Sequence, residues 1–453
     1  FGSSHLARAA GGPLMVASRS ASGSPSRKLR RLAHGPAEPE WVQAMGGDVK
    51  VCNGGEAGGG GCEVNGVAGT TLAMTTAAPH VTSEDIMPVL RRMLSSVNQR
   101  CAQGAEELLS FGELAEYKLA VSQEKSTDPP SQKLLRLQQQ LAAGLHQHFR
   151  RRWPSSLPDW SPEEKARGLD RPTGNRTLEG HGVDLSVVGV PYINAARISG
   201  LVPSALSYVV TQHPLRNTIA DFWLMVLAVQ PVAVLMLNGA AEPEDIDLPP
   251  YWSPAALPNG SGGADPSGGI SGPVLEDDAG CSGAASAVAA AAEGTLADVV
   301  VRPLRCRWRD LEWKGPQLAV SWWRDQSAPP VEQFLALERL IDALVASAPS
   351  VEVGAPPRPL VVHCAAGIGR AGVFVAADSG ARAAAAGADV GGCSPDALIG
   401  RLRQRRTNMV QTADQYEFLH FVLPPLSAQL RAAAARRSDR SSGGGGLGAE
   451  APE

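Results

Sequence analysis

The sequence predicts an α/β fold in which helices cover most of a central sheet. From Tyr192 onward, short apolar runs such as AVLML (233–237) and LVVH (360–363) alternate with helical stretches such as VEQFLALERLIDALVASA (331–348). Short apolar runs indicate buried strands, and the long amphipathic stretch indicates a helix that packs on them. Alternation of this kind is typical of an α/β domain.

Low-complexity segments flank and interrupt this domain. Residues 1–81 are rich in Gly, Ala and Ser, and residues 431–453 and about 254–297 have a similar character. We expect a disordered N-terminal segment, a disordered tail and a surface insertion, because such compositions bury too little apolar surface to fold. Residues 1–37 contain no acidic residue and so resemble an organellar transit peptide, although disorder is the interpretation we favour.

Residues 82–430 are predicted to form one domain that opens with helices within 82–150. Thr82 and Asp85 have capping-box-like spacing, and apolar residues follow at helical intervals. A second helix is expected at about 131–150, with one apolar face formed by leucines: Leu134, Leu137, Leu141 and Leu145.

Charge and cysteine content narrow the functional classes. A net charge of −4 gives no electrostatic case for nucleic acid as a partner. The seven cysteines (52, 62, 101, 281, 306, 364 and 393) have no regular spacing, which argues against a disulfide framework or a zinc site. We therefore expect a reducing, cytoplasmic compartment. The apolar run 222–237 is too short for a membrane span, which takes about 20 residues, so a buried helix followed by a strand is expected there.

The stretch VVHCAAGIGRAGVF (361–374) contains a candidate nucleophile and a candidate anion-binding loop. If Cys364 ends a strand and a helix begins near Arg370, the backbone N–H groups between them converge on one point, with Gly367 and Gly369 adopting positive φ. Such a nest at a helix N-terminus binds anions and favours a thiolate at its centre. Arg370 adds a planar pair of donors suited to two phosphate oxygens. The alternative is a buried cysteine in a Gly-containing turn with an incidental arginine.

Several motifs in chain order resemble the cysteine-dependent protein-tyrosine phosphatases, in their tyrosine-specific receptor and non-receptor branch. VVHCAAGIGRAG is similar to the signature His-Cys-x5-Arg loop of that family. The other similar stretches are YINAARISG (192–200), YVVTQHPLRNTIADFWLMV (208–226), PPYWSP (249–254), VVRPLRC (300–306), SWWRDQSAP (321–329) and LRQRRTNMVQTADQYEFLH (402–420). The resemblance covers about residues 190–425 and implies a twisted mixed sheet flanked by helices.

The resemblance also implies a mechanism without metal or cofactor. Cys364 would form a phosphocysteine intermediate with phosphotyrosine in a protein substrate. Arg370 and the amides of the preceding loop (Ala365, Ala366, Gly367, Ile368 and Gly369) would bind the phosphate oxygens. Asp325 would act as general acid and then as base, and Gln411 and Gln415 would position the attacking water. The implied role is in signalling.

Four departures from the family pattern bear on this mechanism. Ala371 replaces a hydroxyl residue that stabilises the departing thiolate. Arg324 replaces the proline before Asp325, which should loosen the loop and hold the Asp325 carboxylate ionised. His213 replaces a glycine. The substrate-stacking tyrosine is not found, and GNRTLEG (174–180) is its remnant at best, with Thr177 in the place of the tyrosine.

These departures leave two alternatives open. The chain is either a tyrosine phosphatase or a phosphotyrosine-binding pseudophosphatase with weak turnover, and bound phosphate is released in the first case and trapped in the second. The missing tyrosine also admits a phosphatase for phosphoserine, phosphothreonine or phosphoinositides. Ala365, Ala366 and Ile368 argue against the lipid substrate, because they offer no cation to additional phosphates.

Overall fold

The computed structural model describes residues 83–155 and 168–443, with gaps. The gaps in the first range are 106, 111, 115, 118–119 and 121–131, and those in the second are 171–174, 204, 240–241, 243–246, 258–271, 278–298, 349–356 and 389. The predicted disorder of residues 1–81 and the resemblance of residues 1–37 to a transit peptide lie outside the described residues, as does the end of the tail.

A seven-stranded mixed sheet, in the order β1-β2-β7-β3-β6-β5-β4, organises the domain. Its strands are β1 (Ala195–Ile198), β2 (Tyr208–Gln212), β3 (Val234–Met236), β4 (Val274–Asp277), β5 (Val299–Trp308), β6 (Leu311–Val320) and β7 (Leu360–Cys364). The four central strands β2, β7, β3 and β6 run parallel, and the outer pairings are antiparallel. The prediction of a mixed sheet is confirmed.

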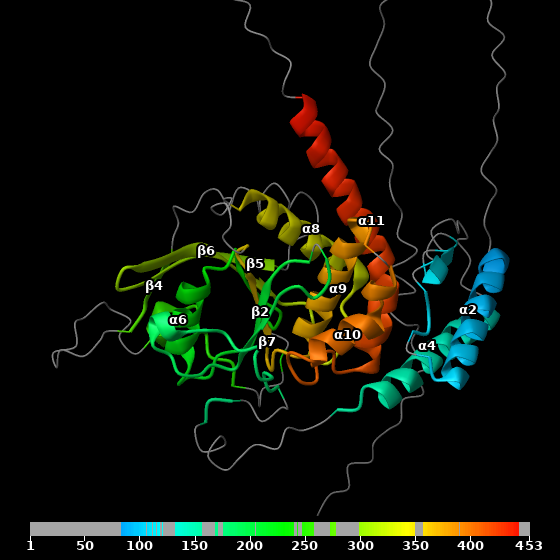
Figure 1. The fold of residues 1–453 in the computed structure, drawn as a ribbon, viewed down its shortest axis with the longest axis horizontal. Helices are drawn as coiled ribbons and strands as arrows, with labels where there is room; N and C mark the ends of the chain where they lie inside the picture. The colour runs from blue at the N-terminus through cyan, green and yellow to red at the C-terminus, as the bar shows by residue number, and fades with distance from the viewer. Residues whose placement is uncertain are drawn as a thin grey trace, which may run out of the picture. The chain divides into compact units, whose positions relative to one another are not determined.

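Helices cover both faces of the sheet, as Figure 1 shows for α6 on one side and for α8, α9, α10 and α11 on the other. Their bounds are α6 (Ile219–Val229), α8 (Val331–Ser347), α9 (Arg370–Ala385), α10 (Pro395–Arg403) and α11 (Ala413–Gly443), and three 3₁₀ turns lie at Ser186–Val188, Pro254–Ala256 and Val390–Cys393. Successive residues of β3 point to opposite faces of the sheet. Val234 and Met236 pack in the core with α6, and Leu235 packs in the core with α8, α9, α10 and α11.

The two strands and the helix predicted from apolar runs are present. The run 233–237 contains β3, the run 360–363 lies within β7, and the stretch 331–348 contains α8. The stretch 222–237 divides as predicted into the end of α6 and strand β3, because Gln230 adopts a left-handed conformation (φ 48°) that ends the helix. Among the described residues, no helix combines the length and apolar character that crossing a membrane requires.

Two N-terminal helices precede the sheet, α2 (Ser83–Gln103) and α4 (Gln132–Arg152). They pack against each other, and α4 also packs against α11. Three of the predicted apolar-face leucines, Leu134, Leu141 and Leu145, are buried, and Leu137 is partly buried against the same core.

Two regions differ from the sequence prediction. The segment predicted as a surface insertion, about 254–297, contributes β4 to the edge of the sheet, where its Leu275 is buried opposite Cys306 of β5. Helix α11 continues to Gly443, past residue 431, where the tail was expected to begin. Alanines and arginines favour a helix, and Arg431 Nη2 donates to the Ala384 carbonyl of α9 at 3.0 Å.

Candidate active site

Cys364 lies at the end of the central strand β7, where the chain leaves the sheet. It is paired in register with Gln212 of the parallel strand β2, and its side chain is buried. The backbone N–H of His213 donates to the carbonyls of both Cys364 and Ala365, at 2.9 and 3.0 Å. The carboxyl ends of parallel strands are the usual place for a ligand site in an open α/β sheet, and the predicted nucleophile lies there.

The loop from Ala365 to Gly369 turns directly into α9, which begins at Arg370 as predicted. Gly367 has φ +69°, and a Cβ there would lie 2.0 Å from the Thr211 carbonyl oxygen. Gly369 has φ −74°, so the expectation of a positive φ at this position is wrong. Glycine at 369 leaves room for the Gln411 side chain, because a Cβ would lie 2.4 Å from Gln411 Oε1 and would displace it.

Arg406 holds this loop in shape from the outside, and the sequence analysis did not identify it. Its Nε donates to the Gly367 carbonyl at 2.8 Å and its Nη2 to the Ala366 carbonyl at 3.1 Å. Its Nη1 donates to Asn194 Oδ1 and to Thr177 Oγ1. Complete burial lowers the pKa of Arg406 to about 10. Two carbonyls bound on the outer side leave the loop N–H groups to face inward. The only sequence signal is its place in the stretch LRQRRTNMVQT.

Arg370 is fully buried at the mouth of the loop and lies among acidic groups. Its Nη1 donates to Glu242 Oε1 and to the Trp323 carbonyl (3.0 Å), and its Nη2 donates to Asp325 Oδ1 at 3.0 Å. Burial opposes the charge, but the negative charges of Cys364, Glu242 and Asp325 together raise the pKa of Arg370 above its ordinary value. The structure thus places Arg370 in contact with Asp325 and close enough to Cys364 for that residue to affect the pKa of Arg370.

Glu242 is a second site residue that the sequence analysis missed. Its side chain is buried against Arg370, and its Oε2 has no hydrogen-bond partner among the described residues. The residue belongs to the acidic run EPEDID (242–247). Nothing in the sequence distinguishes Glu242 from the other acidic residues of this run.

The loop that carries Asp325 is held closed by local hydrogen bonds. Trp323 is buried against Phe334, and its Nε1 donates to the Ser327 carbonyl at 3.0 Å. The Ser327 hydroxyl donates to the Arg324 carbonyl at 2.9 Å. Arg324 is exposed, and the cation that contacts the Asp325 carboxylate is Arg370. These bonds stiffen a loop that was expected to be loosened by the replacement of proline.

Gln411 and Gln415 lie between this loop and the loop of residues 364–370, which we call the cradle. Both side chains are close to Gly369, because a Cβ on this residue would lie 2.4 Å from Gln411 Oε1 and 3.2 Å from Gln415 Nε2. Gln415 Oε1 accepts from the backbone N–H of Gln411 at 2.9 Å, and its Nε2 donates to the Ser327 carbonyl at 3.4 Å. Both predicted glutamines therefore reach the region where the loop of Asp325 meets the cradle.

A family model described as protein-tyrosine phosphatase matches residues 177–262 and 284–424, about half of the chain. This chain belongs to the protein-tyrosine phosphatase family. It is 30% identical over 239 residues to the human tyrosine-protein phosphatase non-receptor type 7, covering 53% of this chain and 57% of that protein. It is 29% identical over 242 residues to a Lar-like tyrosine-protein phosphatase of Caenorhabditis elegans, covering 51% of this chain and 9% of that protein.

Another relative is the human phosphatidylinositol phosphatase PTPRQ, 28% identical over 242 residues, with 52% of this chain and 9% of that protein covered. The chain thus spans little more than half of the length of the non-receptor relative and a small part of the other two. The similarity lies in the phosphatase domain.

Within this phosphatase domain, residues 175–180 of the predicted remnant lie against the cradle. Asn175 Nδ2 donates to the Ala366 carbonyl at 2.9 Å and to Gln212 Oε1 at 3.0 Å. Thr177 pairs with Arg406 in an isolated bridge between the two chain segments. The segment is therefore in place as part of the site, with a threonine where the family resemblance leads one to expect an aromatic ring.

The replacement of glycine by His213 creates a buried aromatic cluster behind the phosphatase cradle. The His213 ring contacts Tyr251 and His363 edge to face, with centroids 5.1 and 5.3 Å away. Tyr251 Oη lies 2.6 Å from His363 Nε2 and accepts from Gln317 Nε2. These contacts fix the residue that precedes Cys364, so His213 adds to the support of the nucleophile.

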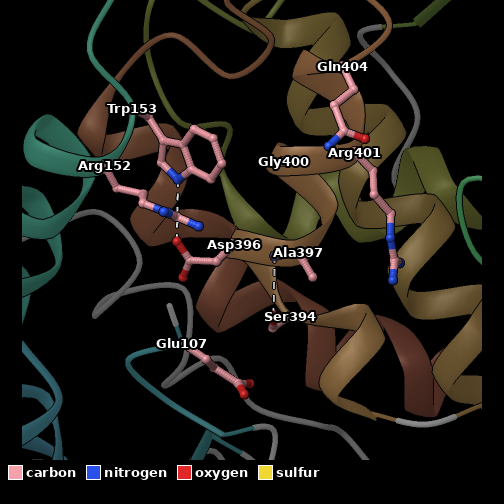
Figure 2. Close-up of a pocket in the computed structure, with 9 residues that line it drawn as sticks. All are labelled: Glu107, Arg152, Trp153, Ser394, Asp396, Ala397, Gly400, Arg401 and Gln404. Atoms are coloured by element: carbon pink, nitrogen blue, oxygen red, sulfur yellow. Dashed lines mark hydrogen bonds between the residues drawn. The ribbon is translucent and has the colours of Figure 1, made fainter. Parts of the chain in front are cut away.

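A cavity of about 470 Å³ lies between the end of α4 and the start of α10, away from Cys364 (Figure 2). Figure 2 shows Trp153 Nε1 directed at Asp396. Two residues not drawn there, His148 and Tyr416, also contact the Asp396 carboxylate. The Ser394 hydroxyl accepts from the Ala397 backbone N–H. Both carboxylate oxygens of Asp396 are thus engaged within the protein, and this cavity is a junction between helices.

Proposed function

We propose that the protein hydrolyses phosphotyrosine in protein substrates through a cysteinyl-phosphate intermediate. The observation that carries this proposal is the buried Arg370 guanidinium, held by Glu242 and Asp325 at the mouth of the loop that follows Cys364. A phosphate dianion is a stronger partner for this guanidinium than either carboxylate, because it carries two charges and can accept two parallel N–H bonds, whereas Glu242 and Asp325 accept different N–H groups. Membership in the phosphatase family supports the same reaction.

In the first step the Cys364 thiolate attacks phosphorus, the P–O bond to the aryl group breaks, and Asp325 donates its proton to the leaving phenolate. In the second step water attacks phosphorus, Asp325 accepts the proton from that water, and the S–P bond breaks to release inorganic phosphate and the thiolate. Arg370 and the amides of residues 365–369 stabilise the charge on the equatorial oxygens in both steps. Gln411 and Gln415 position the water.

Binding of substrate changes the role of Asp325. The phosphate takes the Nη2 donor of Arg370 that the Asp325 carboxylate holds in the free protein. The carboxylate is then free to take up a proton and to meet the leaving oxygen. Phosphate thus replaces the Asp325 carboxylate on Arg370, and the same replacement binds the substrate and frees the general acid.

We place the reaction in signalling and the protein in the cytoplasm. The cysteines among the described residues (Cys101, Cys306, Cys364 and Cys393) are free, which suits a reducing compartment. A nucleophilic thiolate also requires such a compartment, because oxidation would remove it.

Hydrolysis of 4-nitrophenyl phosphate and of a phosphopeptide panel tests the proposal. Cys364→Ser should abolish turnover and still bind tungstate, since the cradle remains and the nucleophile does not. Cys393→Ser, at a second buried cysteine, is the matched control and should stay active. Activity of Cys364→Ser within tenfold of the parent would remove Cys364 from the mechanism, and release of no phosphate by the parent would favour the pseudophosphatase.

A second candidate, hydrolysis of phosphoserine and phosphothreonine, is favoured by Thr177. Without an aromatic ring at this position, no side chain there makes the pocket deep enough to favour phosphotyrosine over the shorter phosphoserine and phosphothreonine. On the leading proposal the phosphopeptide panel gives rates with phosphotyrosine at least tenfold above those with phosphoserine. Equal rates would support the second candidate, and Thr177→Tyr should then restore the preference for phosphotyrosine.

A further inference from the structure

A second cavity, of about 330 Å³, opens at the carboxyl ends of β3 and β6, next to the catalytic cradle. Apolar side chains supply most of its wall, including Met236, Leu248 and Trp252, and none of residues 364–370 lines it. Val300 at its edge is half exposed, which is unusual for a large apolar residue of this protein. A concave, mostly apolar cavity of this size with a few polar groups is typical of a small-molecule site.

One polar group of this wall is an acceptor without a partner. His213 Nε2 faces the Pro249 carbonyl at 2.9 Å, so that nitrogen carries the hydrogen, and in the neutral ring Nδ1 is an acceptor. Asn238 therefore directs its Nδ2 to His213 Nδ1, at 3.1 Å. Its Oδ1 is left buried, with no hydrogen-bond partner among the described residues. A buried acceptor in this state favours a ligand that brings an N–H or O–H group.

A cation is placed at another part of the same wall. The Arg302 guanidinium lies over the Trp252 ring, 4.5 Å from its centroid, and its Nη1 donates to Gln317 Oε1 at 2.8 Å. Burial lowers the pKa of Arg302, and Tyr251 and Asp277 act in the opposite direction. An anion bound at Nε and Nη2 would offset this loss of hydration, and the flat Trp252 surface beside it suits a planar ring.

The cavity is connected to the catalytic groups through two short chain segments. Gly239 and Ser321 both line it and touch each other so closely that a Cβ on Gly239 would lie 2.3 Å from Ser321 Cα. The segment after Gly239 leads to Glu242, and the segment after Ser321 leads to Trp323 and Asp325. Both segments end on the Arg370 guanidinium.

We propose that this cavity binds a small hydroxylated aromatic carboxylic acid, which donates its hydroxyl hydrogen to Asn238 Oδ1 and places its carboxylate on Arg302. The occupant steadies the Gly239–Ser321 contact and so keeps Glu242 and Asp325 on Arg370. Because Asp325 then holds the donor that phosphate requires, the ligand slows turnover. Binding stands on the cavity alone, and the effect on turnover rests on the proposed function.

The probe is 4-hydroxyphenylacetate, titrated by calorimetry into the full chain with the cradle free and again with saturating tungstate. Because the coupling is reciprocal, tungstate should weaken the binding of the acid without abolishing it. Phenylacetate lacks the hydroxyl donor, and 4-hydroxyphenylethanol lacks the carboxylate, so each should bind about tenfold more weakly. Val300→Trp, which fills the mouth, and Arg302→Gln should each weaken the acid by at least tenfold. Val187→Trp is the matched control, at an exposed valine that does not line the cavity, and it should bind like the parent.

Two measurements, binding and turnover, distinguish a failure of the proposed ligand site from a failure of the proposed phosphatase function. No binding of the acid with the cradle free, or equal affinity of the parent and Val300→Trp for it, overturns the site. With 4-nitrophenyl phosphate, the acid should slow the parent severalfold and leave Val300→Trp unchanged. If the acid binds and the parent is active at an unchanged rate, the coupling is wrong. If the acid binds and neither protein hydrolyses phosphate, the site stands and the proposed function fails.

Discussion

Asp325 Oδ1 accepts a hydrogen bond from Arg370 Nη2 at 3.0 Å, so the proposed general acid lies on the proposed phosphate-binding cation. The Asp325 side chain is one-quarter exposed, whereas Arg370 is fully buried. The carboxylate can therefore leave towards solvent while the guanidinium stays. This asymmetry suits an exchange in which the substrate replaces a mobile carboxylate on a fixed cation.

We expect Asp325→Ala to lower the rate by roughly 10²–10⁴-fold, because the leaving oxygen then departs without a proton. The loss should be largest for phenols that are poor leaving groups. The same change frees Nη2 of Arg370, so tungstate should bind more tightly. Rates across a series of aryl phosphates and a tungstate titration check both effects, and equal losses for good and poor leaving groups would mean that Asp325 is not the proton donor.

Ala371 is buried in the first turn of α9, directly after Arg370. Without a hydroxyl there, expulsion of the thiolate loses a hydrogen bond to a charged group, on the order of 1.5–3 kcal/mol. That corresponds to roughly ten- to a hundredfold in the second step. We expect a burst of phenol followed by slow turnover, and Ala371→Ser should speed the slow phase. A rapid-quench trace without a burst, together with an unchanged kcat in the variant, would show that the second step is not limiting.

Arg406→Lys tests the support of the cradle. One ammonium cannot bind the Ala366 and Gly367 carbonyls together in the way that the guanidinium does. We expect kcat to fall and tungstate to bind at least tenfold more weakly, with the leaving-group dependence unchanged, because Asp325 is intact. Arg405→Lys is the control, since Arg405 contacts the Arg401 carbonyl instead. Tungstate affinity equal to that of the parent would show that Arg406 does not shape the loop.

Stability should depend on pH through Glu338, which is fully buried in α8. Burial, and then the charge of Asp378, raise the pKa of Glu338 well above its ordinary value of 4.5. The folded protein holds this proton while the unfolded chain releases it. The free energy of unfolding therefore falls as pH rises above that ordinary value, by up to about 1.4 kcal/mol per pH unit for one proton, until the raised pKa is reached.

Glu338→Gln should remove this slope, so its stability relative to the parent should increase with pH. Urea unfolding between pH 5 and 8 measures the difference, with the exposed Glu332→Gln of the same helix as the control. A constant difference between Glu338→Gln and the parent across this range would contradict the buried proton.

The sequence could predict the elements of the site whose residues are adjacent in the chain. Cys364, the glycine loop and Arg370 form one continuous signal, and strand β7 and helix α9 follow from it. For Gly369 the residue was predicted but the reason was not, because the space there is limited by Gln411, which comes from a distant segment. Close approach between such segments leaves no local pattern.

Glu242 and Arg406 could not be predicted for a related reason. Glu242 belongs to a run of similar acidic residues, and Arg406 belongs to a run of arginines that all suit a solvated helix end. Only the fold brings Glu242 and Arg406 into the site. The same limit applies to β4, whose short apolar pairing with β5 lies within a low-complexity stretch.

The contacts of Arg406 determine when the anion site can form during synthesis of the chain. Its partner Thr177 is 229 residues earlier in the chain, and the Gly367 carbonyl is 39 residues earlier. During synthesis the nucleophile leaves the ribosome before the arginine that shapes its loop, because Cys364 precedes Arg406. A nascent chain that has exposed Cys364 but not Arg406 therefore has a thiol without a formed anion site. On the proposed function, such a chain cannot bind the phosphate of a substrate, and it becomes competent only after Arg406 has been made.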